Sequence, residues 1–244
     1  EIIKLEIIHP NLLYMRNMIT GIISILLLFT MFWNFIKPQV TAKNENGNFV
    51  LKNKNVELVF ANGKEFLFKE FRMDGMNILP VDGSTTHPWQ LIYRGPNGEN
   101  PTLMPRWGEY KGGEIQKTQD ASTLIFTWQM VIDAGPTCPV RILVTLGKDA
   151  ELPEWRIEAE MPEGWVITES EFPRIAVNRP EGAKGILPVG FGTEYTIGNE
   201  GQLQSRYPSC TGTMQLVLMH HKGGTVYFAA QDKRGIWQSI QNEK

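Results

Sequence analysis

The chain has 244 residues, of which 42% are hydrophobic and 20% are charged, and its formal net charge at pH 7 is −2. This composition excludes a disordered chain, because it contains enough apolar side chains to build a core. The small net charge and the lack of any lysine- or arginine-rich run argue against a nucleic-acid-binding protein, since binding to phosphates needs a concentrated basic surface. The length suits one large β domain or two small ones.

The first 42 residues have the composition of an export signal. A positive charge, Arg16, follows Met15, an almost wholly apolar run occupies residues 19–33, and Val40-Thr41-Ala42 has the small-residue pattern that a signal peptidase reads. We therefore expect a signal peptide over residues 15–42 and a mature protein that is periplasmic or extracellular.

Two further expectations concern the same region. Residues 1–14 precede Met15 and are interpreted as an over-extended start, so that translation begins at Met15. The alternative to cleavage is an uncleaved membrane anchor, because the apolar run, extended through Ile36, approaches the roughly 18–20 residues that span a bilayer. In either case we expect the chain after residue 42 to face the outside of the inner membrane.

Residues 43–244 are expected to form a single all-β domain, an antiparallel β-sandwich. From Phe49 onward, short β-type segments alternate with Gly, Pro and Asn, and no segment combines a 3.6-residue period with a helix cap. Asn62-Gly63 separates two such segments, 56–60 and 65–71, and predicts a hairpin, because a type I′ turn needs positive φ at both central residues.

The later segments fit the same architecture. Residues 123–131 and 154–161 alternate between apolar and polar side chains, which predicts strands with one buried and one solvated face. Residues 140–146 are more uniformly apolar, as expected for a strand covered on both faces. Residues 214–221 and 225–231 are expected to form a second hairpin around two glycines.

The sequence contains no catalytic or metal-binding signature. Nucleophile-elbow, P-loop, dinucleotide-binding and zinc-protease patterns are all missing, and we expect no cofactor and no metal. Cys138 and Cys210 do not have metal-ligand spacing; in an oxidising compartment they could pair, or both could stay free. Glu158 and Glu160 share the polar face of a strand and are interpreted as solvated surface, not as a catalytic carboxylate pair.

The region from Asp82 to Gly113 interrupts the rhythm of short strands and contains the candidate site. Long loops in compact domains are either functional or disordered, and the aromatic residues in this one disfavour disorder. Its segment Arg106-Trp107-Gly108-Glu109-Tyr110 combines a planar cation, two aromatic rings and a carboxylate. Aromatic faces bind the C–H surfaces of sugars, and charged groups bind their hydroxyls.

This segment therefore predicts a contact with carbohydrate. The candidate side chains are Arg106, Trp107, Glu109 and Tyr110. The alternative is a purely structural loop, held in place by a Trp107 side chain that is tucked into the core.

Four short segments carry a resemblance to a known family: residues 155–160 (WRIEAE), 171–175 (EFPRI), 207–215 (YPSCTGTMQ) and 224–232 (GTVYFAAQD). Together they resemble the N-terminal galactose-mutarotase-like super-sandwich of large secreted bacterial glycoside hydrolases. The nearest group is the glycosidase-like family related to endo-α-N-acetylgalactosaminidases. The resemblance covers most of the mature chain, from Phe49 to Asp232.

The resemblance implies an order of signal peptide, β-sandwich and (β/α)₈ barrel, with the catalytic carboxylates in the barrel. It implies that this chain is the non-catalytic front of an exported glycoside hydrolase, truncated before its barrel, whose ligand is an oligo- or polysaccharide. One alternative is a stand-alone carbohydrate-binding or surface protein. Another is an aldose-epimerase-like enzyme, which needs a His/Glu acid–base arrangement, with His87, His220 and His221 as its candidates.

Overall fold

The computed structural model describes residues 40–73, 75–79, 87–132, 135–176, 182–187, 192–196, 204–207, 216–221, 224–229 and 238–241. This part of the chain consists mainly of antiparallel strands, with a short 3₁₀ helix and no α-helix. The predicted all-β fold is confirmed. No helix within the described ranges is long and apolar enough to cross a membrane. Most of the expected signal peptide, up to residue 39, lies outside these ranges.

The chain divides into two compact units. The first consists of residues 1–75 and 86–173, and the second of residues 76–85 and 174–244. The sequence predicts a single domain over 43–244, and that boundary stays a prediction.

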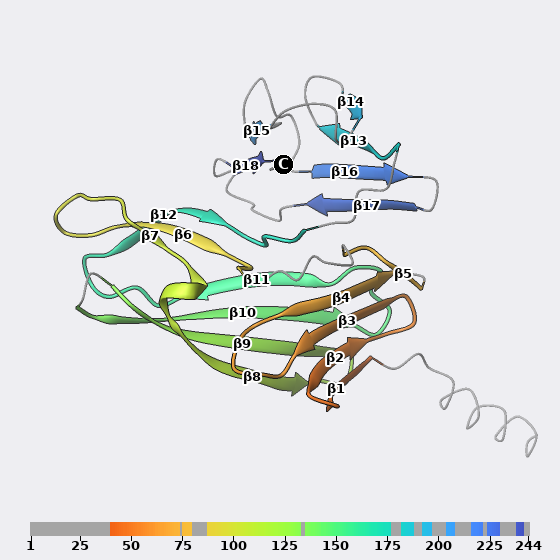
Figure 1. The fold of residues 1–244 in the computed structure, drawn as a ribbon, viewed down its shortest axis with the longest axis horizontal. Coiled ribbons are helices and arrows are strands. Elements are labelled where there is room, and N and C mark those ends of the chain that lie inside the picture. Colours follow the sequence, from red (N-terminus) through yellow and green to blue (C-terminus); the bar gives the residue numbers. More distant parts are fainter. Residues whose placement is uncertain are drawn as a thin grey trace, which may run out of the picture. The chain divides into compact units, whose positions relative to one another are not determined.

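The described residues of the first unit form three sheets (Figure 1). In strand order, the first sheet contains β1 (Thr41–Glu45), β2 (Asn48–Lys52), β3 (Val56–Ala61) and β4 (Phe68–Met73), and it ends with the short strand β5 (Met76–Asn77). The second contains β11 (Glu154–Ala159), β10 (Thr137–Gly147), β9 (Ala121–Val131) and β8 (Glu109–Lys117). The third contains β12 (Val166–Glu171), β6 (Gln90–Arg94) and β7 (Thr102–Leu103). The 3₁₀ helix η1 (Pro105–Trp107) directly precedes β8.

The β1–β4 sheet and the β8–β11 sheet pack face to face around an aromatic core, as the two layers in Figure 1 show. The ring of Phe60 on β3 lies 4.5 Å from that of Phe68 on β4 and 4.9 Å from that of Phe126 on β9. Phe66 lies between the sheets, with its ring centroid 5.0 Å from Phe126 and 5.5 Å from Trp128. All five side chains are buried, so this core supplies the apolar burial that holds the sandwich together.

The period-2 pattern predicted for residues 123–131 is confirmed, because the apolar residues at even positions of β9 are buried. The expectation that residues 140–146 are covered on both faces is wrong. In β10 the outward side chains are only half-buried, and among them Arg141 pairs with Glu158 at 3.2 Å and with Glu160 at 2.8 Å. Around Arg141 the outer face of this sheet is therefore charged surface, as the interpretation of the two glutamates requires.

The two-residue hairpin lies at a different Asn-Gly pair from the one expected. Asn46 and Gly47 have φ of 50° and 70°, and they connect β1 to β2. Around Asn62-Gly63 the strands β3 and β4 do pair, but β4 begins only at Phe68, and Gly63 does not have positive φ. The longer connection lets Phe66 enter the core, where it is 4% exposed.

The second unit contains two sheets among its described residues. One has the order β14 (Thr193–Thr196), β13 (Lys184–Leu187), β16 (Leu216–His221) and β17 (Gly224–Ala229). The other pairs β15 (Gln204–Tyr207) with β18 (Gln238–Gln241). The hairpin predicted for residues 214–221 and 225–231 is confirmed, since β16 and β17 pair antiparallel with His221 opposite Gly224.

Candidate functional site

The predicted sugar-contact segment is divided between a helical turn and a strand. Pro105 begins η1, where its fixed φ suits a first helical position, and the Gly108 N–H donates to the Pro105 carbonyl at 3.1 Å. β8 starts at Glu109, so Glu109 and Tyr110 are strand residues. The expectation of one continuous loop is therefore wrong for this half of the segment, because Glu109 and Tyr110 pair with β9.

Trp107 is at the surface, with 51% of its area exposed. The guanidinium carbon of Arg106 lies 5.0 Å from the centre of its ring, a cation–π contact that contributes about 0.5–1 kcal/mol at an exposed site. The alternative interpretation, in which Trp107 is tucked into the core, is wrong. The core positions are taken by Trp89 and Trp128, whose rings lie 5.9 Å apart and which are 0% and 2% exposed.

The backbone on both sides of Trp107 is tightly packed. A Cβ added to Gly108 would lie 2.1 Å from the Met130 sulfur, so the backbone after η1 runs directly against β9. Pro105, at the start of the same turn, is buried. The residues that flank Trp107 in the turn, Pro105 and Gly108, are therefore packed against the core, while the Trp107 ring itself is exposed.

Glu109 projects from the outer face of the sheet and is paired with Lys111. The two charged groups are 2.6 Å apart, and both side chains are largely exposed. Lys111 is not among the residues that the sequence pattern predicts for this site. Its signal was the spacing of two residues, since side chains at i and i+2 of a strand point to the same face.

Tyr110 points to the opposite face from Glu109. It lies across from Trp128 of β9, with the ring centroids 5.2 Å apart, and its hydroxyl is buried without a hydrogen-bond partner among the described residues. Burial raises the pKa of Tyr110 to about 12. The structure therefore places the Tyr110 hydroxyl in the core, and it leaves Arg106 and Trp107 together at the surface.

The remaining candidate residues are the histidines considered for an epimerase and the two cysteines. Nδ1 of His220 lies 2.8 Å from the Thr225 hydroxyl. His87 belongs to the first unit, and the side chain of His221 is not among those that the structure describes.

Cys138 is a buried free thiol whose sulfur is 3.6 Å from that of Met161, and burial raises its pKa to about 11. Cys210 is not among the described residues. Within the described ranges, no group of three His, Cys, Asp or Glu side chains could hold a metal ion.

A comparison with known protein families finds no match. A search of curated proteins finds a protein of Bacteroides thetaiotaomicron, described as a "Putative glycoside hydrolase", that is 94% identical over 218 residues. These residues are 89% of this chain but 32% of the relative, so the chain spans about a third of the relative's length. The similarity relates the chain to part of a protein that is described as a putative glycoside hydrolase. It does not show membership of the galactose-mutarotase-like family, and that membership stays a prediction.

Proposed function

We propose that this chain is the non-catalytic N-terminal β-sandwich of an exported glycoside hydrolase, and that it binds an oligo- or polysaccharide during carbohydrate degradation. The observation that carries the proposal is the 94% identity to about a third of a protein described as a putative glycoside hydrolase, together with an all-β fold in this part. The family resemblance puts the catalytic barrel in the remaining part of the larger protein. Sequencing the gene beyond the codon for Lys244 tests this proposal. A reading frame that continues into such a barrel supports it, and a gene without one favours a stand-alone binding protein.

Arg106 and Trp107 form the proposed contact with sugar, and we call them the Trp107 patch. The exposed indole offers an apolar plane, and the guanidinium beside it offers hydrogen-bond donors. A pyranose ring has one surface of C–H groups and a rim of hydroxyls, so the two side chains match both. Glu109 can accept hydroxyl hydrogens at the edge of the patch, whereas the buried hydroxyl of Tyr110 does not take part.

Replacing Trp107 by alanine tests the patch. We expect Trp107→Ala to abolish binding on a glycan array while lowering the free energy of unfolding by less than about 1 kcal/mol, because half of the side chain is already solvated. Trp89→Ala is the control for a core tryptophan and should cost about 3–5 kcal/mol. If the parent binds no glycan, or if Trp107→Ala binds as well as the parent, the patch is not a sugar contact.

The non-catalytic role has its own test. The purified chain should hydrolyse no aryl glycoside of any common sugar. Turnover that persists through repurification, and disappears when a residue of this chain is changed, would contradict the proposal. Anomer exchange of glucose or galactose, followed by polarimetry, tests the epimerase alternative separately.

The proposal of export rests on residues 15–42. The last two of these residues lie in β1, so the position of signal-peptide cleavage affects this strand. Ala42, the expected last residue of the signal, is 1% exposed and lies in β1, where it pairs with Leu51 of β2. Cleavage after Ala42 would remove Thr41 and Ala42 from that strand. N-terminal sequencing of the periplasmic protein should begin at Lys43 if the expected site is used, and an intact chain found in the cytoplasm would contradict export.

A further inference from the structure

Among the arginines that the structure describes in the first unit, Arg106 alone has no hydrogen-bond acceptor or carboxylate partner within the described residues. Arg94 donates to the Asn100 side chain at 3.2 Å, and Arg141 is ion-paired with two glutamates. Arg72 and Arg156 are also paired with carboxylates. Within the described part of the chain, the interaction that the Arg106 guanidinium makes is the cation–π contact with the ring of Trp107. Its donors are therefore free to bind a ligand.

The charges around Arg106 do not cancel this unpaired positive group. Glu109 is the nearest carboxylate in the sequence, and its charge is balanced by Lys111 at 2.6 Å. The segment 105–111 thus carries one net positive charge, and that charge lies beside an exposed aromatic plane. An anion on a ligand would meet attraction at Arg106 and little repulsion from Glu109.

The chemistry of a guanidinium narrows the class of ligand. Its planar fork of N–H donors matches a carboxylate or a sulfate better than a single hydroxyl, and such charge-assisted bonds are about twice as strong as neutral ones. A neutral sugar would use Trp107 and leave most of this capacity unused. An acidic sugar would use both members of the patch at once.

We propose that the Trp107 patch binds an acidic saccharide, with the sugar ring on the Trp107 indole and the carboxylate or sulfate of the sugar on the Arg106 guanidinium. This rests on the proposed function, since it names the class of ligand for the same surface. The two groups come from adjacent residues at the end of η1, and the guanidinium lies over the Trp107 ring in a cation–π contact, with its carbon 5.0 Å from the ring centre.

The test compares matched ligands on the full chain by titration calorimetry. The probes are α-1,4-linked trigalacturonate, the neutral galactotriose of the same linkage, and a sulfated galactotriose, so that carboxylate and sulfate are distinguished. We expect at least one of the two acidic ligands to bind about tenfold or more tighter than the neutral one, as one hydrogen-bonded charge pair predicts. Arg106→Gln should remove that advantage, so that the acidic and the neutral ligands bind the variant with similar affinity.

Arg94→Gln is the matched control, because it removes an exposed arginine that already has a protein partner. It should change no affinity, and the melting temperatures of both variants should stay near that of the parent. Equal or weaker binding of both acidic ligands than of the neutral one overturns the acidic specificity and leaves carbohydrate binding standing. An acidic preference that survives Arg106→Gln also overturns the role of Arg106. If none of the saccharides on a broader glycan array binds, the proposed function fails as well.

Discussion

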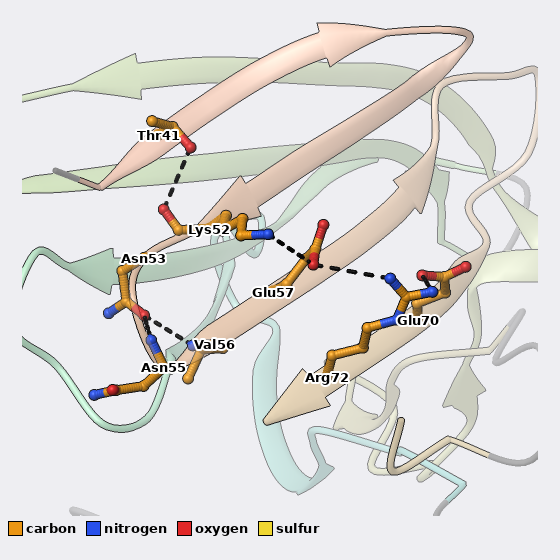
Figure 2. Close-up of polar contacts among 8 residues, drawn as sticks. All are labelled: Thr41, Lys52, Asn53, Asn55, Val56, Glu57, Glu70 and Arg72. Carbon is orange, nitrogen blue, oxygen red and sulfur yellow. Dashed lines mark hydrogen bonds and ion pairs between the residues drawn. The ribbon is translucent and has the colours of Figure 1, made fainter. Parts of the chain in front are cut away.

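Asn53 connects the two sheets of the sandwich through one side chain. Its carboxamide oxygen accepts from the backbone N–H groups of Asn55 and Val56, both at 2.9 Å, and so closes the turn between β2 and β3 (Figure 2). Its amide nitrogen donates to the carbonyl of Gly147 at 2.9 Å and to that of Ala150 at 2.7 Å, at the end of β10. The residue is 4% exposed, so water cannot replace these four bonds.

Two substitutions separate the two halves of this contact. Asn53→Ala removes all four hydrogen bonds, and at about 0.5–1.5 kcal/mol each we expect a loss of roughly 2–6 kcal/mol in the free energy of unfolding. Asn53→Asp keeps both acceptor bonds but replaces the donor nitrogen by an oxygen that faces two carbonyl oxygens. We expect it to cost about 2 kcal/mol or more at pH 7, since two buried carbonyls lose their donor and a charge is placed against them.

Urea denaturation followed by tryptophan fluorescence measures these differences, and thermal melting checks them. Asn55→Ala is the control, because Asn55 takes part only through its backbone N–H, which alanine retains. It should stay within about 0.5 kcal/mol of the parent. If Asn53→Asp is also within that limit, the bonds to Gly147 and Ala150 do not hold the sheets together and the reasoning is refuted.

Two further predictions concern the core. Gly113→Ala should lose about 1–3 kcal/mol in the free energy of unfolding, because its Cβ would lie 2.7 Å from the Phe49 ring and 3.0 Å from that of Phe126, whereas Gly63→Ala, with nothing within 4 Å, should be nearly neutral in urea denaturation. The parent should lose stability as pH rises above the unfolded tyrosine pKa of about 10, since the folded pKa of Tyr110 is about 12 and the folded state keeps the proton longer. Tyr110→Phe should lack this component of the alkaline loss and be no less stable at pH 7, so an unchanged alkaline slope in spectrophotometric unfolding titrations would contradict the buried hydroxyl.

Local pattern determined the strands with one buried face. The alternation of residues 123–131 predicts β9 from its own side chains, because the pleat places every second side chain on the same face of the sheet. The β16–β17 hairpin follows for a similar reason, from two apolar segments around a pair of glycines. These features need no knowledge of what packs against the strand.

Tertiary packing decided between features that are locally equivalent. Asn46-Gly47 and Asn62-Gly63 are the same dipeptide, and only the first forms a tight hairpin, because the connection containing the second also delivers Phe66 to the core. Trp89 and Trp107 both follow a proline-containing segment in the same irregular region, yet one is packed against Trp128 and the other is half-exposed. Which aromatic ring reaches the solvent depends on the space left by residues distant in sequence, such as Met130 beneath Gly108. For the same reason the bonds from Asn53 to Gly147 and Ala150, nearly a hundred residues away, leave no trace in the local sequence.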